Sequence, residues 1–131
     1  MKLPVFFTDV FERLMGTQEY EAFLNSFDEK RLTALRVNQL KLSEERFLEI
    51  SKLNLSPVPW VSGGFYYKGE ETPGKHPHYH AGLYYIQEPS AMMPAALLSP
   101  KPGDRVLDLC AAPGGKTTQL GCLMQDEGLL V

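Results

Sequence analysis

Apolar residues recur at helical spacing near the start of the chain. Over residues 4–15 they lie three or four positions apart, and Gly16 follows as a helix stop. A second helix is predicted with Thr17 as its N-cap and with an apolar stripe made by Tyr20, Phe23, Leu24 and Phe27. Such stripes are typical of helix faces that pack in a core, so we interpret both helices as structural.

The pattern changes in the middle of the chain. Alternation over residues 32–37 predicts a strand. Ser43 can cap a third helix over residues 44–53, with an inward face made by Phe47, Leu48 and Ile50. The aromatic residues of the segment 58–67 surround a glycine pair, which predicts a strand pair or one kinked strand.

Polar, glycine and proline residues over 68–74 form the best candidate for a domain boundary. We therefore expect a small N-terminal α+β domain over residues 1–70. An α/β portion would follow over residues 71–131.

A strand, a glycine turn and a helix follow one another in that second portion. Residues 87–98 predict a helix, and residues 105–110 predict a buried parallel strand. Pro113-Gly114-Gly115 then turns the chain, and residues 116–123 form a helix whose free N–H groups face the turn. Residues 129–131 begin another strand. This order predicts a Rossmann-like α/β sheet that accepts an anionic or polar ligand group at the turn.

Two known nucleotide-binding loops differ from this turn. A P-loop requires glycine where Cys110 stands, although Gly115-Lys116-Thr117 matches the end of that motif. The dinucleotide fingerprint G-x-G-x-x-G does not fit either, because Gly114 and Gly115 are adjacent and no third glycine follows at the required step, although Gly121 lies further along the helix. A P-loop-like NTP-binding protein, with Lys116 and Thr117 on phosphates and magnesium, stays open as an alternative. So does a tight turn that binds no ligand.

Three segments resemble motifs of one enzyme family. Asp108-Leu-Cys-Ala-Ala-Pro-Gly-Gly-Lys-Thr117 is similar to the cofactor loop of the Nol/Nop/Sun family of RNA cytosine-5 methyltransferases. The segment Tyr84-Tyr-Ile-Gln-Glu-Pro-Ser-Ala-Met92 is similar to the segment that precedes the cofactor loop in this family. A third motif resembles Arg36-Val-Asn-Gln-Leu-Lys41, with Gln39 where a small polar residue is expected. The order and spacing of the segments agree with the family, and its bacterial ribosomal RNA enzymes are the most similar members.

The resemblance implies S-adenosyl-L-methionine as the cofactor, bound on a class I methyltransferase sheet. It also implies that residues 84–92 line the pocket for cofactor and base. A helix N-terminus and the charge of Lys116 would both suit a carboxylate. The implied activity of the full-length protein is methylation of cytosine C5 in RNA, with ribosomal RNA as the expected substrate. The residues that match the family's cofactor loop are Cys110, Ala111, Ala112, Pro113, Gly114, Gly115 and Lys116.

The same resemblance implies an N-terminal fragment of an enzyme. A ribose-binding acid and the family's Pro-Cys and Thr-Cys motifs are expected beyond Val131. Cytosine C5 becomes nucleophilic when a thiolate adds to C6, and neither Cys110 nor Cys122 matches those motifs, so no catalytic residue is assigned. We expect Cys110 to pack as a small apolar residue and Cys122 to lie on a helix face. We also expect the chain to be inactive alone and its uncovered sheet edge to permit self-association.

Charge and composition narrow the class of protein. A net charge of −3 is unfavourable for binding phosphate, yet Lys30, Arg31, Arg36 and Lys41 form a basic cluster. This cluster is a candidate phosphate-binding face, and an ordinary solvated surface is an equal alternative. We expect the N-terminal domain to have an accessory role in RNA binding, and a non-catalytic RNA-binding module remains an alternative. Hydrophobic residues make up 44% of the chain, which is typical of a globular protein. The lack of a secretory signal and of an apolar stretch of membrane-spanning length predicts a cytoplasmic protein.

Three histidines alternate in the sequence at His76, His78 and His80. In an extended strand they would share one face and could bind zinc or copper. The sequence offers no fourth ligand nearby, so we interpret them as surface histidines and assign no metal.

Overall fold

The computed structural model describes residues 3–68 and 71–131. Contacts divide the chain into one unit that ends at Arg31 and a second that runs from Leu32 to Val131. The division expected at residues 70 and 71 is not where the contacts separate, because strands from both sides of it pair in one sheet. Across the two described stretches, no helix has the length and apolar character needed to cross a membrane.

The first unit is a pair of helices, α1 (Val5–Met15) and α2 (Thr17–Ser26). Gly16 joins them with φ of 78°, and it is Gly16 rather than Thr17 that occupies the N-cap position of α2. Aromatic rings pack between the helices; the rings of Phe11 and Phe23 stack with centroids 5.2 Å apart. The apolar stripes predicted from the sequence therefore meet each other, as expected for core-forming faces.

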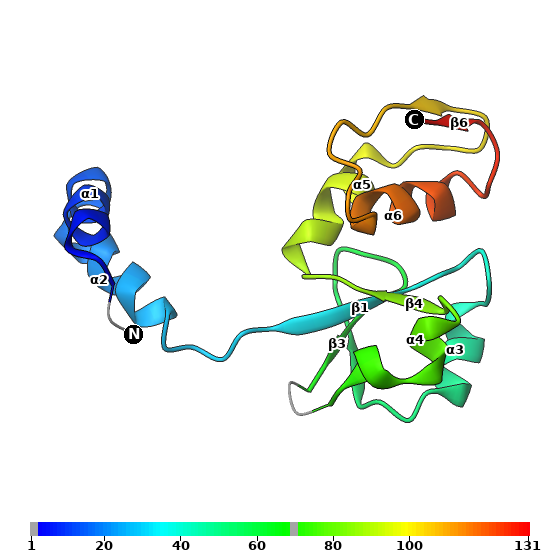
Figure 1. Ribbon diagram of the computed structural model, residues 1–131, viewed down its shortest axis with the longest axis horizontal. Helices are drawn as coiled ribbons and strands as arrows, with labels where there is room; N and C mark the ends of the chain where they lie inside the picture. Colours follow the sequence, from blue (N-terminus) through cyan, green and yellow to red (C-terminus); the bar gives the residue numbers. More distant parts are fainter. Residues whose placement is uncertain (1–2, 69–70) are drawn as a thin grey trace. The chain divides into compact units, whose positions relative to one another are not determined.

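An antiparallel sheet of four strands forms the base of the second unit (Figure 1). Its strands, in spatial order, are β2 (Leu55–Pro57), β3 (Gly64–Tyr67), β1 (Thr33–Val37) and β4 (Tyr84–Ile86). Leu35 at the centre of β1 lies opposite Phe65 on β3 and Ile86 on β4. Successive side chains of a strand point to opposite faces, so β1 directs Leu35 and Val37 to one side and Ala34 and Arg36 to the other.

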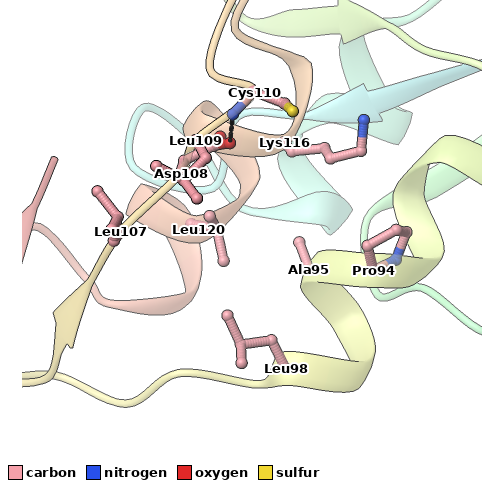
Figure 2. A pocket seen from close by; sticks show the side chains of 9 residues that line it. All are labelled: Pro94, Ala95, Leu98, Leu107, Asp108, Leu109, Cys110, Lys116 and Leu120. Carbon is pink, nitrogen blue, oxygen red and sulfur yellow. Dashed lines mark hydrogen bonds between the residues drawn. The ribbon is translucent and has the colours of Figure 1, made fainter.

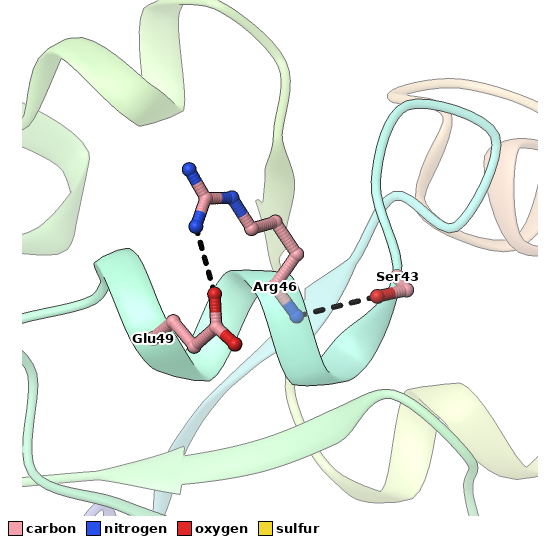
Figure 3. A network of polar contacts seen from close by, with 3 residues as sticks. All are labelled: Ser43, Arg46 and Glu49. Carbon is pink, nitrogen blue, oxygen red and sulfur yellow. Dashed lines mark hydrogen bonds and ion pairs between the residues drawn. The ribbon is translucent and has the colours of Figure 1, made fainter.

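Helix α3 (Glu44–Ile50) covers the face that carries Leu35, and the buried ring of Phe47 packs there. The predicted cap is confirmed, since Ser43 Oγ accepts a hydrogen bond from the Arg46 amide at 3.2 Å (Figure 3). Arg46 also pairs with Glu49 at 2.7 Å on the exposed side. The expected inward position of Leu48 is wrong. Its side chain is exposed because the sheet covers only the Phe47 side of the helix.

The three histidines do not lie in an extended strand. They flank and enter a short helix, α4 (Pro77–His80), which follows a single 3₁₀ turn, η1 (Pro73–Lys75). His76 Nδ1 accepts a hydrogen bond from the His78 amide at 3.1 Å, so this nitrogen caps the helix. The shared face that a strand would give is therefore lost. The described residues contain no cluster of three or more metal-binding side chains.

A second layer lies on the opposite face of the sheet from α3 (Figure 1). It contains the 3₁₀ turn η2 (Ser90–Met92), the helices α5 (Met93–Leu98) and α6 (Gly115–Leu123), and the parallel strands β5 (Arg105–Val106) and β6 (Leu129–Leu130). The predicted strand-turn-helix-strand order is confirmed. The buried strand expected over residues 105–110 is shorter and more exposed, because β6 is its one strand partner among the described residues. Leu107 and Leu109 are exposed.

Candidate functional site

The glycine turn opens helix α6. Gly114 is the N-cap residue with φ of 105°, a conformation that L side chains adopt at a cost. A Cβ atom at Gly114 would meet nothing within 4 Å, so the backbone there is open to an approaching ligand. The first N–H groups of a helix have no acceptor within the helix. The turn therefore offers donors and a partial positive charge to an anionic group.

Asp108 and Thr117 brace the loop that leads into this turn. Asp108 accepts one hydrogen bond from the Cys110 amide at 3.0 Å and another from the Thr117 hydroxyl at 2.7 Å. That hydroxyl also lies 3.2 Å from the carbonyl oxygen of Ala111. This brace was not predicted from the sequence, although an Asp at the end of a strand often accepts a hydrogen bond from the amide two residues on. Because the Thr117 hydroxyl is engaged here, the P-loop alternative gains no support.

A cavity of about 250 Å³ lies beside the loop (Figure 2). Figure 2 shows side chains from α5, from α6 and from the segment after β5 around the open space. Its walls are mostly apolar, with the charges of Asp108 and Lys116 at its edge. The lining residues are Pro94, Ala95, Leu98, Leu107, Asp108, Leu109, Cys110, Lys116 and Leu120.

The seven loop residues expected to hold a cofactor are consecutive but differ in burial. Cys110 and Lys116 line the cavity, and residues 111–113 are exposed beside it. Gly114 and Gly115 are half-buried at the helix start. The expectation that Cys110 packs as a buried apolar residue is wrong, since its thiol is exposed on the loop. Cys122 is buried on α6, where its Sγ lies 3.5 Å from Asn38 Oδ1.

Tyr85 supports the glycine turn from the sheet. Its hydroxyl donates to the carbonyl oxygen of Pro113 at 3.1 Å. A Cβ atom added to Gly115 would lie 3.3 Å from a ring carbon of Tyr85, so glycine lets the helix start approach strand β4 closely. Of the segment 84–92, which was expected to line the pocket, Tyr85 reaches the loop. Met92 instead lies fully buried in the core, and α5 lines the cavity.

Arg36 is a buried link between the sheet and the same helix. Its guanidinium donates to Gly115 O at 3.2 Å, to the Thr118 hydroxyl at 2.8 Å and to Gln87 Oε1 at 3.2 Å. The side chain is 3% exposed, and this burial lowers the pKa of Arg36 below its ordinary value. The expected basic surface face is therefore wrong for Arg36. Lys30 and Arg31 belong to the other unit.

Family models match most of the chain. The model described as the N-terminal domain of 16S rRNA methyltransferase RsmF matches residues 3–89. The model described as 16S rRNA methyltransferase RsmB/F matches residues 95–131. The transition between the two matched regions falls in η2 and the start of α5, where the chain passes from the antiparallel sheet to the second layer.

Individual relatives agree with these models. Ribosomal RNA small subunit methyltransferase F of Vibrio campbellii is 44% identical over 119 residues, which cover 85% of this chain and 25% of the relative. The tRNA (cytosine(49)-C(5))-methyltransferase of Pyrococcus abyssi is 38% identical, over 92% of this chain and 39% of the relative. The crystal structure of a methyltransferase homolog protein from Pyrococcus horikoshii superposes with a TM-score of 0.81 at 32% identity, over 98% of this chain and 43% of that one.

The chain thus spans about a quarter of the length of the ribosomal RNA methyltransferase that it matches. Its antiparallel sheet and its strand-turn-helix layer both have counterparts in solved methyltransferase structures. The resemblance inferred from the three sequence motifs is confirmed. The chain belongs to the RsmF family of 16S rRNA methyltransferases, within the Nol/Nop/Sun family of RNA cytosine-5 methyltransferases.

Proposed function

We propose that the loop over residues 110–116 binds S-adenosyl-L-methionine and that the full-length protein methylates a cytosine C5 of ribosomal RNA in the cytoplasm. The observation that carries the proposal is the N-cap Gly114, whose backbone at φ of 105° opens beside a cavity of about 250 Å³. Family membership supports the reaction class. We also propose that the residues before the second layer are an accessory domain that contacts RNA.

The chemistry of the loop suits the cofactor. The methionine part of S-adenosyl-L-methionine ends in a carboxylate, and a helix N-terminus provides N–H donors and a favourable dipole for such a group. Lys116 adds a positive charge at the edge of the cavity. The apolar walls contributed by Leu98 and Leu120 provide contact area for uncharged parts of a ligand. When bound, the cofactor supplies a methyl group on a sulfonium, which an electron-rich carbon can attack.

Neither cysteine of the chain is placed as the nucleophile. Cys122 is buried between Arg36 and Asn38, out of reach of a base. Cys110 is exposed but belongs to the loop that we assign to the cofactor. Because methylation at C5 requires a thiolate at C6, we expect the isolated chain of 131 residues to transfer no methyl group.

Binding of S-adenosylhomocysteine tests the cofactor site directly. Calorimetry with the full-length protein should show that Gly114→Val weakens binding about tenfold or more, which corresponds to roughly 1.4 kcal/mol. Lys116→Met tests the charge without altering the turn. Lys75→Met is the matched control, because Lys75 is exposed on η1 and does not line the cavity. Unchanged affinity in both site variants would remove the loop from the proposed site.

Methyl transfer is a separate measurement. Labelled S-adenosyl-L-methionine and ribosomal RNA should yield labelled cytosine with the full-length protein and no label with the 131-residue chain alone. Label incorporated by the isolated chain would contradict the assignment of the nucleophile to a residue outside it. A full-length protein that binds S-adenosylhomocysteine but labels only other RNAs would correct the substrate and leave the cofactor site intact.

A further inference from the structure

A second cavity lies beside the link that Arg36 makes between the sheet and helix α6. Its volume is about 150 Å³. It is separate from the cavity beside the glycine turn, because the two share no lining residue. The lining residues come from β1 and the segment after it, from the turn before β4, from β4 and from α6; they are Arg36, Asn38, Lys41, Gly82, Tyr84, Tyr85 and Thr118.

The charge of this cavity is unbalanced. Arg36 and Lys41 both line it, and none of its lining residues is a carboxylate. The hydrogen-bond acceptors of Arg36 are the neutral groups of Gln87, Gly115, Thr118 and Cys122. Buried charges in proteins are normally paired with an opposite charge, because removal from water is costly. A cation that is 3% exposed and lacks an anionic partner among the described residues therefore favours an anion from outside.

Lys41 is held at the cavity by its surroundings. Its ammonium donates to the carbonyl oxygen of Ala81 at 2.6 Å. A Cβ atom at Gly82 would lie 2.9 Å from Lys41 Nζ, so the glycine leaves room for the ammonium. Asn38 fixes the same turn by donating from Nδ2 to Gly82 O at 3.0 Å. The second cation is therefore positioned by the fold and not merely exposed near the opening.

We propose that this cavity binds one phosphate group, supplied by the backbone of the RNA substrate. The source of the phosphate rests on the proposed function, whereas the anion chemistry rests on the charges alone. A volume of about 150 Å³ is many times the roughly 10–15 Å³ that a cavity needs to hold one water, so there is room for an anion larger than water. Arginine and lysine together are well suited to phosphate, since one offers a planar set of donors and the other a point charge.

The site would join substrate and cofactor through shared residues. Arg36 and Thr118 both line the phosphate cavity, and Arg36 on β1 donates a hydrogen bond to Thr118 on α6. The glycine turn opens this same helix. Tyr85 lines the cavity and donates to Pro113 in the cofactor loop. An RNA phosphate bound here would therefore lie one side chain away from the loop that we assign to S-adenosyl-L-methionine.

The first test titrates inorganic phosphate into the 131-residue chain and follows backbone amides by NMR. Saturable shifts at Asn38, Lys41 and Thr118 are expected, and chloride at matched ionic strength should not reproduce them. Lys41→Gln should weaken the response several-fold, whereas Lys75→Gln, an exposed lysine outside the cavity, should not. Absent shifts, or equal shifts with chloride, would overturn the phosphate site and leave the cofactor proposal to its own test with S-adenosylhomocysteine.

The second test identifies the source of the phosphate. Affinity for a single-stranded oligoribonucleotide is measured against salt concentration. Lys41→Gln should make the slope of log affinity on log salt shallower by roughly 0.7, the value for one phosphate contact on a single strand. Lys75→Gln should leave the slope unchanged. Phosphate shifts together with identical RNA slopes in wild type and Lys41→Gln would overturn RNA as the source and retain a site for a free phosphate.

Discussion

Two glycines of helix α6 should respond to alanine in opposite directions. Gly114 occupies the N-cap with φ of 105°, whereas Gly121 lies within the helix with an ordinary helical backbone. An added Cβ atom meets nothing within 4 Å at either position. Neither alanine side chain should therefore clash with a neighbour. The backbone conformation at each position then decides whether the substitution raises or lowers the free energy of unfolding.

The magnitudes follow from the two backbones. A left-handed conformation costs an L residue about 1–2 kcal/mol, so Gly114→Ala should destabilise the second unit by that amount. Alanine in a helix interior is favoured over glycine by about 0.8–1.0 kcal/mol, so Gly121→Ala should stabilise it. The two variants should therefore differ by roughly 2–3 kcal/mol in free energy of unfolding.

Urea unfolding followed by tryptophan fluorescence measures this difference. Trp60 is the one tryptophan of the chain, and its Nε1 donates to the Pro89 carbonyl oxygen at 3.1 Å, so it reports on the unit that contains α6. With a slope of about 1–2 kcal/mol per molar urea, Gly114→Ala should lower the midpoint by roughly 0.5–2 M and Gly121→Ala should raise it by roughly 0.4–1 M. Amide exchange within α6 provides an independent reading of the same change.

Two results would contradict the opposite effects expected at Gly114 and Gly121. If Gly114→Ala unfolds at the same urea concentration as wild type, the turn does not hold the left-handed backbone in solution. If Gly121→Ala lowers the midpoint, the space beside that residue is occupied in a way that the contacts do not show. The first outcome would also weaken the assignment of the turn as an open approach for a cofactor.

Three further predictions concern the surface and the pH dependence. Leu109 is 85% exposed beside the open β5 edge, so the chain should self-associate in light scattering and Leu109→Asp should reduce its apparent mass. Burial raises the pKa of the Tyr84 hydroxyl, which donates to Pro73 O at 2.8 Å. Stability from the neutral phenol should be complete below the unfolded pKa of about 10 and lost as pH rises through the higher folded value; Tyr84→Phe should flatten this alkaline decline in a circular dichroism titration. Hydrogen bonds from its own amide and from Ser43 lower the pKa of Glu45. Protection of the amides in the first turn of α3 against exchange should therefore be present above pH 4.5 and lost as pH falls through the lower folded pKa. Glu45→Gln should remove this pH dependence of amide exchange.

Several features could be predicted because their causes lie within a few residues. The N-cap of α3 requires Ser43 and the amide of Arg46, which are three positions apart. The turn into α6 requires glycine at Gly114, and the adjoining strand and helix are visible in the hydrophobic pattern. The family motifs of the loop are likewise contiguous. Local chemistry of this kind does not depend on where the rest of the chain lies.

Features that depend on distant residues were misjudged. Whether Leu48 and Cys110 are buried depends on which other elements pack against the helix and the loop that carry them. The hydrophobic pattern of the sequence does not specify those neighbours. The strand after Arg105 was expected to be buried, yet burial requires neighbours on both faces, and the described residues place β6 alone beside it. The alternating histidines are compatible with a strand or with a helical turn. The structure shows a helical turn, in which His76 accepts a hydrogen bond from the amide of His78.

The sequence by itself determined the loop, its helix and the family to which the chain belongs, because each is specified by contiguous residues. Tertiary structure alone decided the role of Arg36, which was expected on a basic surface face. Its hydrogen bond to Gly115 spans 79 positions, and the pairing of β1 with β3 and β4 fixes the place of Arg36 in the sheet from which the side chain reaches α6. The same tertiary arrangement brings Lys41 and Thr118 to one cavity. Sites built by such distant contacts become visible only when the sheet and the helix meet.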